Sequence, residues 1–285
     1  MARKTVARRP HQSAGWEQVC GALLLLSASC GFASPVRNVI VCIGDGMGYG
    51  HVQAARCYYG TNLFFETLPH RGEITTSSAG GRVTDSAAAA TALATGIKVN
   101  DGVLSLAIPG DGSELETVLE FSAARGKRTG LVTTTYMTHA TPAGFGSHES
   151  SRDNAQQIAD DYLLQTRPNV LFGGGAYGMS PSAAAAAGYA VVSNTESLTN
   201  LHAATLTHVS GQFGLTHLPY ANDGVTDLPQ LAQMAAVALD LLSRDPDGFF
   251  LMVEGGRIDH ACHANDLRNV IGVTLAFDDA VRRVV

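Results

Sequence analysis

The segment VEGGRIDHACH, residues 253–263, places two carboxylates and two imidazoles within a short stretch of chain. Asp259 and His263 are four positions apart, so one helical turn would put both side chains on the same face. Carboxylate oxygen and imidazole nitrogen both bind zinc, so this spacing predicts a site for one zinc ion. The alternative interpretation is a polar loop whose charges are solvated.

A second group of candidate ligands offers only oxygen. Glu254 ends an apolar run, Asp45 lies between two glycines in GDGMG, and Thr141 lies in HATPA. Hard oxygen donors of this kind suit magnesium. For GDG alone, a simple turn is an equally good interpretation.

Ser86 lies between an aspartate and a run of alanines in VTDSAAAATALATG. Asp85 is a typical N-cap and the alanines favour helix, so a capped helix is one interpretation. A serine at a helix N-terminus also lies where backbone N–H groups attract an anion such as phosphate, which makes Ser86 a candidate nucleophile. Arg152, in SHESSRDN, offers a guanidinium fork for two phosphate oxygens, or is a surface arginine.

Apolar strands and helical segments alternate along the chain. This alternation predicts an α/β fold with a mostly parallel central sheet and helices on both faces. Ligands of such sheets bind outside the carboxyl ends of the strands, and the polar candidates follow three of those strands. The strands are expected at 38–43, 129–134, 169–175, 189–194 and 247–256, and helices at 115–125, 155–164, 228–242 and 265–285.

Three segments have a less regular pattern. Residues 71–78 (RGEITTSS) are expected to be extended. Residues 138–154 are expected to form a polar loop. The weak pattern of residues 165–225 indicates an insertion.

Taken together, the chain resembles the alkaline phosphatase family from about Val36 to its end. The resemblance rests on GDGMG at 44–48, TDSAAAATA at 84–92, HATPA at 139–143, Arg152, and VEGGRIDHACH at 253–263, in the order of the family's motifs. It implies a phosphate monoester hydrolase acting on small phosphate esters through a phosphoserine, with two zinc ions and one magnesium ion.

The resemblance also implies a role for each matching residue. Ser86 would be the nucleophile, and Arg152 would bind the phosphate. The implied ligands are Thr141 and Glu254 for magnesium, Asp45 shared by magnesium and the second zinc, Ser86 on that zinc, and Asp259 and His263 for the first zinc. Asp85, His139 and His260 would lie next to these groups. The zinc ions would lower the pKa of the Ser86 hydroxyl, stabilise the leaving oxygen and activate water.

The chain departs from the family after His263. The family has a later Asp-His pair and a further histidine as zinc ligands, whereas this chain has no histidine beyond His263. Zinc usually takes about three or four ligands, so we expect a truncated phosphatase domain, 34–285, with little or no turnover. Two alternatives are an exported domain that binds metal or phosphate without catalysis, and a related metal-dependent phosphodiesterase, sulfatase or phosphomutase.

The N-terminus has the three regions of a signal peptide. A basic start, a short apolar run and small residues up to Ala33 predict export, to the periplasm or the medium, with residues 1–33 removed. Arg8 and Arg9 also fit twin-arginine export, and Cys30 fits a lipid anchor. The apolar run is too short for a stable membrane span, and the net charge of −6 argues against nucleic acid. The oligomeric state stays open, with a homodimer as one option.

Overall fold

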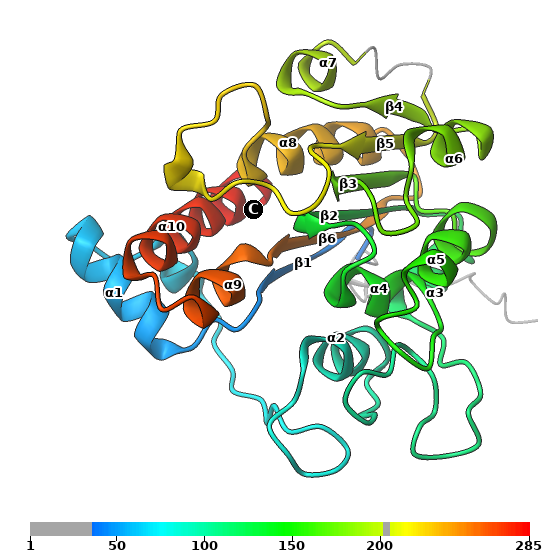
Figure 1. The fold of residues 1–285 in the computed structure, drawn as a ribbon, viewed down its shortest axis with the longest axis horizontal. Helices are drawn as coiled ribbons and strands as arrows, with labels where there is room; N and C mark the ends of the chain where they lie inside the picture. The colour runs from blue at the N-terminus through cyan, green and yellow to red at the C-terminus, as the bar shows by residue number, and fades with distance from the viewer. Residues whose placement is uncertain (1–35, 202–205) are drawn as a thin grey trace, which may run out of the picture. The chain divides into compact units, whose positions relative to one another are not determined.

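Six parallel strands form the centre of the protein in a computed structural model that describes residues 36–201 and 206–285 (Figure 1). The strand order is β1-β6-β2-β3-β5-β4, and every neighbouring pair is parallel. The predicted parallel sheet is therefore confirmed. The strands are β1 (Val39–Gly44), β2 (Arg128–Tyr136), β3 (Val170–Gly174), β4 (Ala190–Val192), β5 (Val209–Gln212) and β6 (Phe249–Gly255).

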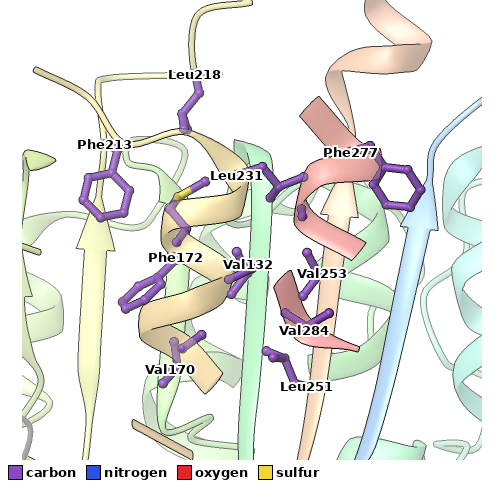
Figure 2. Close-up of a cluster of buried hydrophobic side chains, with 14 of the residues drawn as sticks. Val132, Val170, Phe172, Phe213, Leu218, Leu231, Leu251, Val253, Phe277 and Val284 are labelled. Atoms are coloured by element: carbon purple, nitrogen blue, oxygen red, sulfur yellow. The ribbon is translucent and has the colours of Figure 1, made fainter. Parts of the chain in front are cut away.

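Helices cover both faces of the sheet, because the central strands are apolar on both sides. In β6, Leu251 and Val253 pack against helices α8 (Leu231–Leu242) and α10 (Leu267–Val284), as Figure 2 shows. Phe250 and Met252 alternate with them and pack on the opposite face. That face is covered by α2 (Ser86–Thr95), α3 (Val118–Ala123), α4 (Ala140–Gly146), α5 (Ala155–Asp160) and α6 (Pro181–Ala186).

The remaining described elements are short, except for helix α1, which packs against α10. They are α1 (Tyr49–Tyr59), η1 (Phe64–Thr67), the π-helix η2 (Asp161–Gln165), α7 (Thr195–Thr199), η3 (Ala221–Asp223) and α9 (Arg257–His263). The helices of residues 36–201 and 206–285 are too short or too polar to span a bilayer. The predicted signal peptide, residues 1–33, lies outside the described residues.

The serine helix α2 forms as its sequence predicts. The Asp85 side chain accepts a hydrogen bond from the Ala88 amide at 3.0 Å, which caps the first turn. The helix ends at Gly96, whose φ of 76° closes it in the left-handed region. A β-carbon on Gly144 of α4 would lie 2.8 Å from that of Ala90, so glycine permits α4 to pack closely against α2.

Two predictions about the connections were wrong. The expected loop after β2 contains the buried helix α4, which begins after His139; Pro142 fits because a helix tolerates proline in its first turn. The expected insertion at 165–225 is part of the sheet: it supplies β3 and β4, where strands were expected, and β5, which was not expected. Its pattern is weak because β5 and β4 are only four and three residues long.

Two further expectations need smaller corrections. The helix expected at 115–125 is the shorter α3, because the Thr117 hydroxyl accepts from the Glu120 amide while the Glu120 carboxylate accepts from the Thr117 amide, and this capping box sets its start. Residues 71–78 join no strand of the sheet and are mostly exposed.

Candidate active site

Three neighbouring strands end at the same edge of the sheet and bring the first candidates together. Asp45 directly follows β1, and the register aligns Glu254 of β6 with Ile43 of β1 and Thr133 of β2. The Ser86 hydroxyl donates to both carboxylate oxygens of Asp45, at 3.1 and 3.2 Å. The serine at the start of α2 thus faces the aspartate at the end of β1.

Glu254 is a buried carboxylate with an incomplete set of partners. Its Oε2 accepts a hydrogen bond from the Thr133 hydroxyl, while its buried Oε1 has no partner. Burial raises the pKa of Glu254, the charge of Asp45 raises it further, and the hydroxyls of Thr133 and of buried Thr141 lower it less. The pKa of Glu254 is raised overall, so the surrounding residues do not supply enough positive charge to balance its ionised form.

A compact set of ligand atoms surrounds that carboxylate. Asp45, His139 and Glu254 each contribute one oxygen or nitrogen, and these atoms all lie within 4.8 Å of one another. Burial and then the charge of Asp259 raise the pKa of Asp45. Two carboxylates held together by the fold, with an imidazole beside them, fit a divalent cation.

Asp259 lies close to the turn after β1 because that turn contains a glycine, Gly46. Gly46 has a φ of 61°, and a β-carbon there would lie 2.5 Å from the Asp259 Oδ1, so glycine is needed for α9 to approach the β1 turn. His263 Nε2 lies 3.4 Å from Asp259 Oδ2, one helical turn away, as the spacing predicts. The His263 side chain is 80% exposed, so it faces solvent.

Arg152 is held beside the start of α2. Its Nη1 donates to Asp85 Oδ2 at 3.0 Å, and its Nη2 lies 3.4 Å from His139 Nε2. Burial by itself raises the pKa of Asp85, but hydrogen bonds from Ala88, Gly102 and Arg152 outweigh it and lower the pKa. The charged Asp85 therefore both caps the serine helix and positions the guanidinium.

An aromatic cluster next to Arg152 contains the imidazoles of His139, His217 and His260 and the ring of Tyr136. The ring centroids of His139 and His260 are 5.6 Å apart, those of His139 and His217 5.8 Å, and those of His217 and His260 4.4 Å. The Tyr136 ring lies edge-on to His139 at 5.1 Å. Arg257 donates from Nη1 to His260 Nδ1 at 2.9 Å, which fixes that ring's orientation.

His217 was missed from the sequence. It lies in the loop that follows β5, which ends at Gln212, so the strand-end rule applied to that loop would have selected it. The run VSGQ, which forms β5, is too short and too polar to indicate a strand from the sequence alone. Burial, followed by the charges of His260 and Arg257, lowers the pKa of His217 to about 4.

The fold and the site together define a class: an α/β protein with acidic, imidazole and hydroxyl groups gathered at the carboxyl ends of parallel strands. The chain belongs to the alkaline phosphatase family, whose profile matches residues 36–285. The resemblance carried by the sequence motifs is thus confirmed.

Individual relatives agree with this assignment. The chain is 38% identical to alkaline phosphatase 3 of Bacillus subtilis, over 88% of this chain and 57% of that protein. It is 33% identical to the alkaline phosphatase of Escherichia coli, over 88% of this chain and 66% of that protein. The crystal structure of Thermus thermophilus alkaline phosphatase matches with a TM-score of 0.77 and 35% identity, over 86% of this chain and 55% of that one. The chain therefore spans about three fifths of the length of these relatives.

Proposed function

We propose that this chain carries the phosphoryl-transfer centre of a phosphate monoester hydrolase, with Ser86 as the nucleophile. The observation that supports this most is the placement of Ser86: its hydroxyl is held by Asp45, and it is the first residue of α2. The first-turn amides and the helix dipole favour an anion at that point. Membership of the alkaline phosphatase family agrees with this chemistry.

The protein's own residues account for substrate binding and for the first bond change. The guanidinium of Arg152, positioned by Asp85, would bind two oxygens of the phosphate. Ser86 Oγ, having lost its proton to solvent, would form a bond to phosphorus while the bond from phosphorus to the ester oxygen breaks. The leaving oxygen would take a proton from solvent and depart as the alcohol. Water would then cleave the phosphoserine to release phosphate. Burial, followed by the charges of Arg152 and the two neighbouring imidazoles, lowers the pKa of His139 to about 3, so this ring is neutral beside the phosphate.

The ligand atoms divide into an oxygen set and a mixed set. Asp45, Glu254 and Thr141 would hold magnesium, and the unpartnered buried Oε1 of Glu254 fits this use. Asp259 and His263 would hold one zinc, and Asp45 with Ser86 a second. When bound, such cations supply positive charge that lowers the pKa of the Ser86 hydroxyl and stabilises the leaving oxygen. A variant of the alkaline phosphatase of the Antarctic bacterium TAB5, which is 27% identical to this chain, has Mg bound in its M3 site.

The number of zinc ligands around Asp259 and His263 bears on the turnover rate. Among the described residues this pair offers two zinc ligands, fewer than the roughly three or four that zinc usually takes. We therefore expect slow turnover from this polypeptide. The same observation favours a second candidate function, in which the chain binds cation and phosphate without releasing product.

The test uses the full chain with Zn²⁺ and Mg²⁺ and an aryl phosphate. We expect phenol release and a phosphoryl group on Ser86, detected by intact mass, and both should vanish in Ser86→Ala. Ser180→Ala is the matched control, because Ser180 also lies at a helix N-terminus, where it caps α6. Hydrolysis that survives Ser86→Ala would disprove the proposal. Tight phosphate binding with no phosphoserine would favour the binding function.

Export and assembly remain predictions. The signal-peptide pattern of residues 1–33 predicts a mature protein that begins at Ser34. The intact mass of the protein recovered outside the cytoplasm checks this, and a chain that keeps its first 33 residues there would contradict it. Light scattering of the purified chain decides between a monomer and the homodimer considered above.

A further inference from the structure

Tyr136 and Tyr177 form an aromatic stack that the proposed phosphoryl transfer does not use. Their ring centroids are 4.3 Å apart and the rings are inclined by 30°. The His217 ring lies 5.0 Å from that of Tyr136 at a similar inclination, 34°. Tyr136 comes from the last residue of β2, and Tyr177 from the turn after β3, so two strand ends meet here.

This stack begins at the phosphate site. The Tyr136 ring packs edge-on against His139, whose Nε2 lies 3.4 Å from Arg152 Nη2. His139 also supplies one of the ligand atoms clustered within 4.8 Å around Asp45. A group joined to a phosphate held by Arg152 would therefore find aromatic rings next to it.

The outer ring of the stack is presented to solvent by a constrained turn. Tyr177 is 50% exposed although Tyr136 covers part of it. Its φ is 45° and that of Ala176 is 63°, values that residues other than glycine seldom adopt. The turn is held by a hydrogen bond from the Met179 amide to the Ala176 carbonyl at 3.0 Å, and by one from the Thr138 hydroxyl to the Tyr177 carbonyl at 2.8 Å.

Such a conformation costs free energy, and a half-exposed ring recovers little of it from core packing. Two successive strained residues that hold an aromatic ring in solvent beside a binding site are more typical of ligand contact than of fold stabilisation. The flat face of a tyrosine ring stacks on other planar rings, without requiring charge or hydrogen bonds from them.

We propose that Tyr177, supported by Tyr136 and His217, binds the alcohol part of the substrate when that part is an aromatic ring. The site would thereby prefer aryl phosphate monoesters to small alkyl ones. This inference rests on the proposed function, because Arg152 and Ser86 must hold the phosphate for the ring to reach the stack.

The test measures equilibrium binding, which does not depend on turnover. Isothermal titration of the full chain with Zn²⁺ and Mg²⁺ would compare three ligands: inorganic phosphate, methylphosphonate and phenylphosphonate. We expect phenylphosphonate to bind about two- to tenfold more tightly than methylphosphonate, the range expected for one aromatic stacking contact. Tyr177→Leu should reduce this ratio to about one and leave the affinity for inorganic phosphate unchanged.

Two variants serve as matched controls. Tyr177→Phe keeps the ring and should keep the preference. Tyr59→Leu removes a tyrosine of similar exposure, 52%, at the end of α1 and should change nothing. Because inorganic phosphate reports on the phosphate site alone, an unchanged affinity for it also shows that Tyr177→Leu is folded.

The outcomes separate the two proposals. Equal affinity for the two phosphonates, or a preference that survives Tyr177→Leu, would overturn the aromatic subsite and leave the proposed function intact. If none of the three ligands binds, the phosphate site itself is wrong, and the subsite fails with it.

Discussion

Two buried histidines on the segment that follows β2 are held in opposite ways. His148 donates from Nε2 to the Glu120 carboxylate and from Nδ1 to the Ser105 carbonyl, both at 2.9 Å. Burial by itself lowers the pKa of His148, but these hydrogen bonds outweigh it and raise the pKa to about 9. His139 is more deeply buried, its Nδ1 has no partner and Arg152 faces its Nε2. Burial, followed by the charge of Arg152, lowers its pKa to about 3.

The carboxylates in the two regions differ in the same way. Glu120 accepts from His148 and Thr117, and although burial raises its pKa, these partners lower it below the usual value. Glu254 faces Asp45 and keeps one oxygen unpartnered. The Glu120 carboxylate is thus paired within the fold, whereas the Glu254 carboxylate at the end of β6 has a buried oxygen without a partner. A buried carboxylate with a raised pKa and an unpartnered oxygen at the edge of a sheet is typical of a binding site.

The largest effect is expected at Glu254. We predict that Glu254→Gln removes most of the stabilisation by Mg²⁺, which for the unmodified chain is about 3 kcal/mol at a hundredfold excess over the dissociation constant. Without Mg²⁺ the variant should be as stable as the parent or more stable, because the repulsion from Asp45 is gone. Thermal unfolding with and without Mg²⁺ measures both.

Glu120→Gln is the matched control for that experiment. It should lower stability by the same amount with and without Mg²⁺, because it breaks the ion pair with His148. The stabilisation by Mg²⁺ should stay as large as in the parent. A Glu254→Gln variant that behaves like Glu120→Gln would show that Glu254 supports the fold rather than a cation.

The next largest effect is expected at His148. His148→Gln should lower the free energy of unfolding by about 2 kcal/mol near pH 6, because it leaves the half-buried Glu120 without its cation. Urea denaturation measures the difference. A change below about 1 kcal/mol would mean that the two regions do not differ in the way described above.

The same pair predicts a dependence on pH. A folded-state pKa raised from 6.5 to about 9 gives stability that is complete below pH 6.5 and disappears as pH rises through 9. The stability difference between the parent and His148→Gln should therefore shrink steadily from pH 6.5 to pH 9. If the difference is constant across this window, His148 does not carry the charge.

The smallest effect is expected at His139. His139→Gln breaks no hydrogen bond at Nδ1 and should change the free energy of unfolding by less than about 1 kcal/mol in the absence of Zn²⁺ and Mg²⁺. Urea denaturation beside His148→Gln provides the direct comparison. A loss as large as that of His148→Gln would make His139 a structural residue.

Much of the fold and part of the site could be predicted from the sequence. The Asp85 cap, the serine at the first position of α2, and the shared face of Asp259 and His263 all depend on neighbours within one helical turn. Apolar, β-branched runs identified β1, and the strand-end rule selected Asp45 and Glu254. The helix α4 and the strand β5 were missed because they are short and their patterns are weak.

The aromatic stack could not be predicted in this way. Tyr136, Tyr177 and His217 come from three strand ends, and no local spacing joins them. Only the order of β2, β3 and β5 in the sheet places them side by side. A tyrosine in a glycine-rich turn has no local feature that distinguishes it from an exposed loop residue.

The sequence by itself determined which residues begin helices, which runs become strands and which side chains could bind cation or phosphate. These properties depend on backbone propensity and on neighbours a few residues away. Only the tertiary structure decided which candidates meet and which charges they carry. His139 and His148 have the same side chain, but the fold buries His139 more deeply and beside the charge of Arg152, whereas it gives His148 hydrogen bonds to Glu120 and Ser105 that outweigh its burial.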